Sequence, residues 1–282
     1  MEKRQPIQRL FDISGRVAVV TGGAGLLGSE FCHTLAQVGA TVVIADANEA
    51  AAARLARALI EEGHQAIAVE TDVTNPASAE HMVAVAMQSF SHLDILVNSA
   101  ALDPKFDPPH AAHHGPNSPG SGAFEDYPLE AWNQAMAVNL TGAFLCCQAA
   151  VRPMLDQGGG VIVNLSSIYG LAGPDQRIYQ RPGQPPQYKP VYYSVTKAGI
   201  LGLTQYLSTY YAGKNIRVNA LSPGGVFNGH DEAFVQAYSA RAVIGRMAEK
   251  DEMNGALLFL VSDASQYMTG ANLVVDGGWT AW

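Results

Sequence analysis

The sequence predicts an α/β fold: a single doubly wound domain in which a seven-stranded parallel sheet carries helices on both faces. Short β-branched, apolar runs alternate with longer segments of helical periodicity, which is the pattern of a parallel sheet covered on both sides. The predicted strands are 16–22, 41–47, 66–73, 93–100, 160–167, 216–224 and 272–278. The predicted helices are 26–38, 49–62, 76–90, 129–156, 191–213 and 249–261, with a shorter one at 231–242.

The periodic pattern continues along the whole chain, so we expect one domain over residues 1–282. Two stretches rich in Gly, Pro and polar residues interrupt it, at 103–123 and 173–190. The same strand and helix patterns continue on either side, which distinguishes these stretches from domain linkers. We expect both to be surface insertions, and loops of this length are often functional.

Composition and charge narrow the range of partners. The 282 residues are 48% hydrophobic, enough for a sizeable core, and carry a formal net charge of -8, which argues against a nucleic-acid-binding surface. The N-terminus lacks an apolar targeting segment, and we expect no run long enough to span a bilayer. These observations predict a cytoplasmic protein with a small-molecule substrate. Its cysteines, Cys32, Cys146 and Cys147, are expected to be reduced structural thiols.

A glycine-rich segment, TGGAGLLG at 21–28, follows the first predicted strand and opens the first long helix. In this context backbone N–H groups and the helix dipole bind a pyrophosphate. Gly22 would permit the tight turn, Gly25 would let the backbone approach a phosphate, and Gly28 would let the helix pack closely. A purely structural turn between strand and helix is the alternative.

Asp46 ends the second predicted strand about 20 residues further on, where a carboxylate binds the adenosine ribose hydroxyls and repels a 2′-phosphate. No Lys or Arg stands in the glycine segment or directly after Asp46, so NAD is the predicted cofactor. Asp72 and Val73 follow the third strand, and Asn98 lies in the fourth, at the expected cofactor edge. Asp72 and Asn98 also suit a local capping role.

These motifs, taken in order, resemble the short-chain dehydrogenase/reductase family over nearly the whole chain. Besides those above, they are NLTGAF at 139–144, LSSIYG at 165–170, YSVTK at 193–197, RVNALSPGG at 217–225 and TGANLVVDGG at 269–278. The resemblance implies a Rossmann-fold oxidoreductase that moves a hydride between a nicotinamide and a secondary alcohol or ketone, as a homo-dimer or homo-tetramer. It implies cofactor contacts from Gly22, Gly25, Leu26, Leu27, Asp46, Asp72, Val73, Asn98, Ala100, Tyr193, Lys197, Pro223, Gly224 and Val226.

By the same resemblance, Tyr193 is the catalytic acid and base, Lys197 its activator, Ser167 the hydroxyl that binds the substrate oxygen, and Asn139 the residue that positions a proton-relay water. Tyr193 and Lys197 stand at i and i+4 of a predicted helix and share a face. A nearby ammonium is expected to lower the tyrosine's pKa. Tyr192, five positions from Lys197, is predicted to be a packing aromatic, and Ser166 to point away from the Ser167 side of the strand.

The 173–190 insertion separates Ser167 from Tyr193 and is expected to loop outward, leaving the catalytic geometry intact. Its Arg177, Arg181 and Tyr188, together with Tyr179 and Lys189, would suit an anionic, hydroxyl-rich ligand. Asn228 and His230 resemble the family's substrate-covering loop. The second half of the chain looks like oxidoreductases of surface-polysaccharide and legionaminic-acid-type sugar biosynthesis and gluconate 5-dehydrogenase-like proteins, which implies a sugar, sugar acid, sulfonated sugar or sugar nucleotide as substrate.

The sequence offers three alternative functions. His110, His113 and His114 suggest a metal cluster, but they lie in a Pro- and Gly-rich segment without a nearby Cys or carboxylate at ligand spacing, so no metal is predicted. A catalytically idle NAD(H)-binding redox sensor would keep the fold, and the complete set of catalytic residues argues against it. A reductase of a non-sugar ketone stays open.

Overall fold

A computed structural model describes residues 6–103, 123–181, 183 and 186–282. Its centre is a sheet of seven parallel strands in the order β3-β2-β1-β4-β5-β6-β7, which confirms the predicted fold class and a single Rossmann-like domain. The strands are β1 Val17–Thr21, β2 Thr41–Asp46, β3 Ala66–Glu70, β4 Ile95–Asn98, β5 Gly160–Leu165, β6 Ile216–Pro223 and β7 Asn272–Val275.

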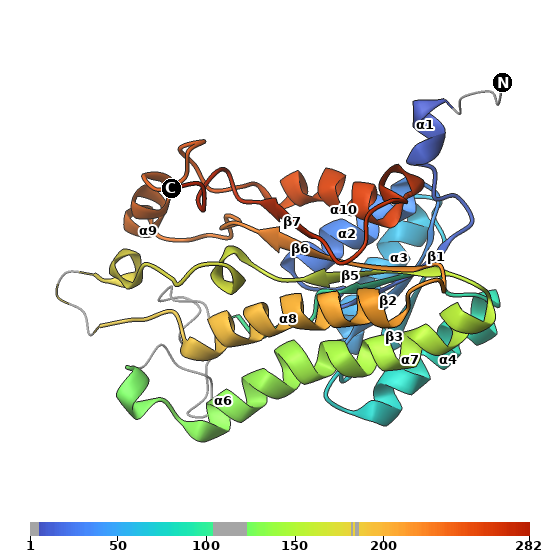
Figure 1. Ribbon diagram of the computed structural model, residues 1–282, viewed down its shortest axis with the longest axis horizontal. Coiled ribbons are helices and arrows are strands. Elements are labelled where there is room, and N and C mark those ends of the chain that lie inside the picture. The colour runs from blue at the N-terminus through green and yellow to red at the C-terminus, as the bar shows by residue number, and fades with distance from the viewer. Residues whose placement is uncertain (1–5, 104–122, 182, 184–185) are drawn as a thin grey trace.

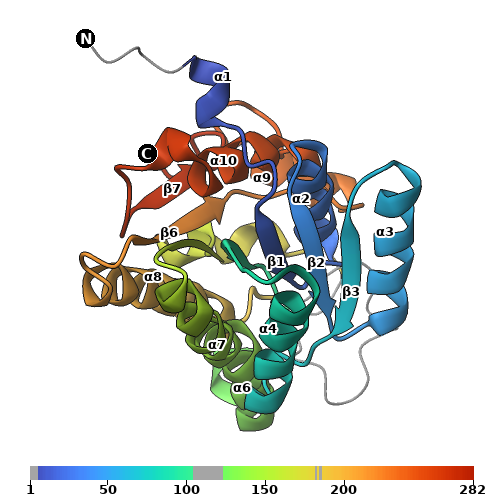
Figure 2. The same ribbon diagram turned by 90° about the vertical axis from the view of Figure 1, so that its right-hand side faces the viewer.

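Helices cover both faces of the sheet, with α2, α3 and α10 on one side and α4, α7 and α8 on the other (Figures 1 and 2). Their bounds are α2 Leu26–Gln37, α3 Glu49–Glu61, α4 Pro76–Phe90, α7 Gly142–Asp156, α8 Val191–Tyr210 and α10 Asn254–Val261. The remaining helices are α1 Ile7–Leu10, α6 Leu129–Met136 and α9 Glu232–Ser239. Short 3₁₀ turns are η1 Phe124–Asp126, η3 Ile168–Gly170, η4 Gln176–Tyr179, η5 Lys250–Met253 and η6 Asp263–Ser265.

Side chains of the central strands alternate between two apolar cores. In β1, Ala18 and Val20 pack with α2, α3 and α10, while Val17 and Val19 pack with α4 and α7. All five residues of this strand are buried. This burial on both faces explains why the strands read as continuous apolar runs and not as alternating ones.

The strand order places a crevice at the middle of the sheet. β1 pairs with β2 on one side and with β4 on the other. The chain first adds β2 and β3 on one side of β1, and then crosses over to add β4 to β7 on the other side. Parallel α/β sheets bind ligands outside the carboxyl ends of the strands at such a reversal. The residues after β1 and β4 are therefore the expected borders of a site.

The predicted helix 129–156 consists of three pieces: α6, a π-helical segment η2 Ala137–Thr141, and α7. π-helical turns inside α-helices often occur at functional sites. By length and composition, the stretch Leu129–Asp156 is long and apolar enough to cross a membrane, contrary to the expectation from the sequence. Half of its most apolar part is buried in this domain, where α7 packs against α4 and β5, as core helices of globular domains do.

The 173–190 insertion does not loop outward where the structure describes it. Its turn η4 contacts α9, and Ile178 and Tyr179 are buried in an aromatic cluster beside the sheet. The hydrophobic side chains among its polar residues explain this packing. Of the other insertion, only its first and last residues, 103 and 123, are described.

Candidate active site

One pocket of about 640 Å³ opens at the carboxyl ends of the strands, at the reversal between β1 and β4. It collects most of the residues singled out from the sequence. Those that line it are Gly22, Gly25, Leu26, Leu27, Gly28, Asp46, Asp72, Val73, Ala100, Ser167, Arg181, Tyr193, Lys197, Pro223, Gly224, Val226, Asn228 and His230. Asn98, Asn139, Arg177 and Tyr188 are not among its lining residues.

The glycine segment is built for close backbone contacts. Gly22 has a φ of 61°, and a Cβ there would lie 2.7 Å from the Cα of Ala100, at the end of β4. A Cβ on Gly28 would lie 2.0 Å from the carbonyl oxygen of Gly22, so α2 packs directly on the loop. Larger residues would push the loop out of place. The cradle at the N-terminus of α2 thus has the tight shape that suits a dinucleotide pyrophosphate.

Two carboxylates border the end of the pocket next to this loop. Asp46 accepts hydrogen bonds from the N–H of Ala24 at 3.0 Å and of Asn48 at 2.9 Å, which fixes its side chain beside the glycine loop. Asp72 accepts from the N–H and the hydroxyl of Thr74, at 2.9 and 2.7 Å. The cationic lining residues, Arg181, Lys189 and Lys197, come from the segment after η4, the end of the insertion and α8, at the other end of the pocket.

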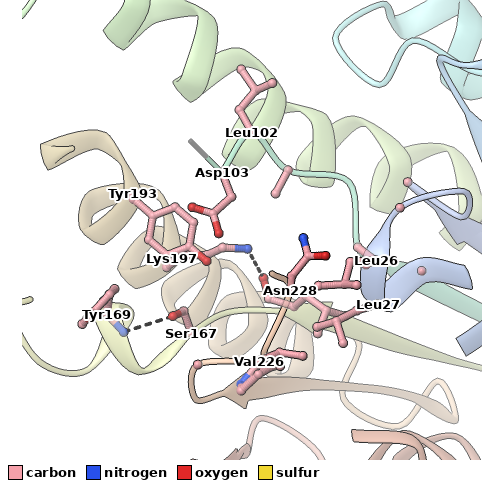
Figure 3. Close-up of a pocket in the computed structure, with 18 of the residues that line it drawn as sticks. Leu26, Leu27, Leu102, Asp103, Ser167, Tyr169, Tyr193, Lys197, Val226 and Asn228 are labelled. Atoms are coloured by element: carbon pink, nitrogen blue, oxygen red, sulfur yellow. Dashed lines mark hydrogen bonds between the residues drawn. The ribbon is translucent and has the colours of Figure 1, made fainter. Parts of the chain in front are cut away.

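Ser167, Tyr193 and Lys197 lie together at the opposite end, from the turn after β5 and the first turns of α8 (Figure 3). The hydroxyl of Ser167 accepts from the N–H of Tyr169 at 3.2 Å and is hydrogen-bonded to the side chain of Tyr193. Ser166 instead donates to the carbonyl of Lys197 at 2.7 Å. The second serine is therefore the one whose hydroxyl meets the tyrosine.

The pKa of Tyr193 is raised well above its ordinary value, because burial opposes the phenolate and the carboxylate of Asp103 repels it. The hydrogen bond from Ser167 acts in the opposite direction and is weaker. This differs from the expectation that Lys197 lowers the tyrosine's pKa. The ammonium of Lys197 lies 5.7 Å from the centre of the Tyr193 ring and donates to the carbonyl of Leu165 at 2.8 Å.

Lys197 itself is only 5% exposed, and burial lowers its pKa to about 8. The nearby Asp103 favours the ammonium, and Lys189 opposes it. Figure 3 shows the carboxylate of Asp103 directed at Tyr193 and Lys197. The chemistry of this end of the pocket thus depends on charges from three parts of the chain.

Asn139 lies in the π-helical segment behind the pocket. Its side-chain amide accepts from the N–H of Leu102 at 2.6 Å and donates to the carbonyl of Leu102 at 3.0 Å. Asn98 is also buried; it donates to the side-chain oxygen of Asn164 at 2.8 Å and so links the ends of β4 and β5. Both amides act on the backbone and strand ends that border the pocket.

The basic residues of the insertion are divided between pocket and surface. Arg181 lines the pocket and pairs with Asp231 at 2.5 Å, and Lys189 pairs with Asp103. The side chain of Arg177 is 87% exposed and pairs with Asp175. The cations that were expected to bind an anionic ligand are therefore each paired with a carboxylate. Arg177, in addition, is exposed and does not line the pocket.

Sequence reasoning missed the aromatic wall of this end of the pocket. The hydroxyls of Tyr179 and Tyr169 are 2.9 Å apart and hydrogen-bonded, and Phe234 stacks with His230 at 4.9 Å. Trp279 is buried behind the wall, edge-on to Tyr169 at 5.6 Å. The aromatic residues are spread over four segments, and their spacing in the chain gave no signal of this cluster.

Of the remaining residues singled out from the sequence, those that the structure describes do not line the pocket. Tyr192 is fully buried, with its ring 6.2 Å from that of Tyr127, as a packing aromatic. All three cysteines are buried free thiols. His110, His113 and His114 lie outside the described residues. Among the residues that the structure does describe, no group of three potential metal ligands comes together.

Comparison with known proteins agrees with this geometry. A family described as Enoyl-(Acyl carrier protein) reductase matches residues 23–280. The cis-4-hydroxycyclohexanecarboxylate dehydrogenase of Sinomonas cyclohexanicum is 37% identical over 94% of this chain and 97% of its own. The D-threitol dehydrogenase of Mycolicibacterium smegmatis is 33% identical over 96% of this chain and 95% of its own.

Among solved structures, a gluconate 5-dehydrogenase from Burkholderia cenocepacia in complex with NADP and tartrate superposes with a TM-score of 0.84. It is 29% identical, and the match covers 97% of this chain and 98% of that one. The family match, the curated relatives and the shared fold span nearly the whole sequence. The protein therefore belongs to the short-chain dehydrogenase/reductase family, an oxidoreductase family that uses a nicotinamide cofactor.

Proposed function

We propose that this protein is an NAD-dependent dehydrogenase that interconverts a secondary alcohol and a ketone on a small, polar, sugar-like or cyclic substrate. The observation that carries the proposal is the meeting of Ser167, Tyr193 and Lys197 in the same pocket as the glycine cradle. A nicotinamide bound there would accept the hydride of the alcohol or deliver it to the ketone.

The side chains supply the proton chemistry. The hydroxyls of Ser167 and Tyr193 are hydrogen-bonded to each other, so both can contact one substrate oxygen. Ser167 orients that oxygen, and Tyr193 accepts its proton in oxidation and returns it in reduction. Lys197, fixed on the carbonyl of Leu165, supplies a cation beside the tyrosine and a donor for a ribose hydroxyl.

The preference for NAD is supported by the charge at the adenosine end. Asp46 is held beside the glycine loop by two backbone N–H groups, in the place where a carboxylate binds ribose hydroxyls and repels a 2′-phosphate. Among the described residues that line this end of the pocket, the charged ones are Asp46 and Asp72. The related gluconate 5-dehydrogenase was solved with NADP, so the carboxylate of Asp46 is the basis of the proposed difference.

The proposed substrate class follows from the other end of the pocket. Tyr169, Phe234 and Tyr238 offer apolar ring faces, while Asn228 and His230 offer polar groups. Such a mixture suits a ring or short polyol with hydroxyls on one side and C–H groups on the other. Cofactor and substrate share about 640 Å³, which favours a sugar, a sugar acid or a sulfonated sugar over a sugar nucleotide.

A matched pair of variants tests this proposal. Purified protein is mixed with NAD or NADP and a panel of aldoses, sugar acids, sulfonated sugars, polyols and cyclic alcohols, and the absorbance of the reduced nicotinamide is followed. We expect turnover with NAD that Tyr193→Phe abolishes and Tyr192→Phe retains, since Tyr192 is buried away from the pocket. Binding of NADH without turnover of any alcohol or ketone would favour the redox sensor instead.

Homo-oligomer formation is the second part of the proposal. Exposed apolar side chains gather on the helices of one face of the sheet, which is a common feature of subunit interfaces. They are Leu129, Phe144, Val195, Tyr206 and Tyr210. We expect a dimer or tetramer in light scattering. The buried thiols support a reducing, cytoplasmic compartment.

A further inference from the structure

Two ammonium groups flank the ring of Tyr193, and the nearer one belongs to Lys189. Its Nζ lies 4.0 Å from the ring centre, whereas the Nζ of Lys197 lies 5.7 Å away. The side chain of Lys189 is 8% exposed and lines the pocket. A buried ammonium at this distance from an aromatic face interacts strongly with it.

The structure holds Lys189 in place from several sides. Its backbone N–H donates to the side-chain oxygen of Gln176 at 2.8 Å, and its carbonyl accepts from the side-chain nitrogen of Gln176 at 3.2 Å. Its ammonium pairs with the carboxylate of Asp103. Gln176 begins η4, so the insertion and the turn after β4 together fix the cation over the ring.

The position of the Lys189 ammonium matters because of the other charges around Tyr193. Asp103 repels a phenolate at Tyr193, and burial opposes it further. Among the residues that the structure describes, the other titratable groups that face the tyrosine come from η3, η4, α8 and the end of the insertion: Tyr169, Tyr179, Tyr192, Lys189 and Lys197. The lysines alone carry positive charge in this set. The ammonium of Lys197 is bound to the carbonyl of Leu165, which leaves Lys189 as the cation that contacts both the ring and Asp103.

We propose that Lys189 is a positioning residue of the reaction. Its ammonium offsets the charge of Asp103 and stabilises the phenolate of Tyr193, the form that accepts the proton of the substrate's hydroxyl during oxidation. In oxidation, the O–H bond of the alcohol breaks and an O–H bond forms on Tyr193, while the carbinol hydride goes to the nicotinamide. Lys189 keeps its protons throughout and acts only through its charge. This inference rests on the proposed function, because it takes Tyr193 as the acid and base.

Three variants with opposite expected signs test the inference. Lys189→Met leaves the charge of Asp103 uncompensated, so Tyr193 should ionise at a pH higher by about one unit. A single neighbouring charge shifts a pKa by about that amount. Asp103→Asn should shift ionisation to lower pH by a similar amount. The double variant should return close to the wild type, and Lys189→Arg should keep the wild-type behaviour because it keeps the charge.

The first readout needs no substrate. With ¹³C at the Cζ of tyrosine, the Tyr193 resonance is assigned by its loss in Tyr193→Phe, and the pH at which it begins to move is compared among the variants. The second readout is the pH profile of kcat/KM for NAD-dependent oxidation, in which Lys189→Met should lose about tenfold on the acidic limb.

Opposite shifts for Lys189→Met and Asp103→Asn in the resonance support the inference. Equal shifts, or none, in properly folded variants would overturn it, whatever the activity of the protein. If the resonance shifts as expected but the wild type turns over no alcohol or ketone, the proposed function fails while the electrostatic role of Lys189 stands. If Lys189 had a purely structural role, its replacement would change stability, but Lys189→Met and Asp103→Asn would not shift the ionisation of Tyr193 in opposite directions.

Discussion

The side-chain amide of Asn139 is bonded to both backbone groups of Leu102, at 2.6 and 3.0 Å. This pair connects the π-helical segment between α6 and α7 to the chain that leaves β4. The next residue, Asp103, carries the carboxylate that faces Tyr193 and Lys197. The amide of Asn139, which does not line the pocket, thus fixes the position of the Asp103 carboxylate inside it.

Replacing Asn139 should therefore lower activity more than it lowers stability. Asn139→Ala removes both bonds to Leu102, and the displaced turn should reduce kcat/KM by about a hundredfold, because small misplacements near a reacting centre have effects of that size. Urea unfolding should show a loss of about 1–3 kcal/mol for the unpaired backbone groups. Asn133→Ala, on the exposed side of α6, is the control and should change neither. Full activity in Asn139→Ala would contradict the role of the Leu102 contact.

The carboxylate of Asp46 should decide between the two nicotinamide cofactors. In Asp46→Ser, the repulsion of a 2′-phosphate is removed and the bonds to the ribose hydroxyls are weakened, so the ratio of NADP to NAD affinity should rise by about tenfold or more. Titration calorimetry with each cofactor measures this ratio. Glu61→Gln, an exposed change of the same charge on α3, should leave it unaltered. A wild type that binds NADP more tightly than NAD would refute the assignment.

Lys197 should limit stability while it serves the chemistry. Burial lowers its pKa from 10.5 to about 8, so below pH 8 the folded state bears a cost of about 3 kcal/mol that the unfolded chain does not. Lys197→Met removes this cost but leaves the carbonyl of Leu165 unpaired, at about 1 kcal/mol. The variant should be inactive yet about 2 kcal/mol more stable at pH 7 in urea unfolding.

The stability difference between Lys197→Met and the wild type should depend on pH. The folded pKa of Lys197 lies below the unfolded one, so the unfolded chain binds more protons between pH 8 and 10.5 and the wild type gains stability as pH rises through that range. The advantage of Lys197→Met should shrink over the same range. A variant that is less stable than the wild type at pH 7 would show that the ammonium is well solvated or well paired.

Gly28 and Gly202 form a matched pair of helical glycines. A Cβ on Gly28 would lie 2.0 Å from the carbonyl oxygen of Gly22, whereas a Cβ on Gly202, in α8, meets nothing within 4 Å. Gly28→Ala should abolish NADH binding, measured by nicotinamide fluorescence, because the cradle must move. Gly202→Ala should bind normally and be more stable by up to about 1 kcal/mol, from helix propensity alone. Unchanged binding in Gly28→Ala would remove the glycine segment from the cofactor site.

The sheet and the tight glycine loop before α2 could be predicted because their signals are local. Buried parallel strands are short β-branched runs, and the glycine segment stands between such a strand and a helix. Tyr193 and Lys197 were predicted to share a helix face from their spacing, and they do so in α8. The seven strands and the crevice at their ends follow from the same pattern.

The substrate end could not be predicted in the same way, because its contacts join distant parts of the chain. Lys189 meets Asp103 across 86 positions, and Arg181 meets Asp231 across 50. Composition marked the insertion as polar and turn-rich, but burial of Ile178 and Tyr179 folds it against α9. Burial of Tyr193 and the charge of Asp103 likewise raise the pKa that helical spacing alone was expected to lower.

The pocket draws its walls from nearly the whole length of the chain, from Gly22 at the end of β1 to Met247 before η5. A molecule that fills it therefore holds the two halves of the sheet together, and any compound that binds only the folded form raises the melting temperature by mass action. Candidate substrates and products can thus be ranked by the thermal shift they cause, including ketones that no oxidation assay would report.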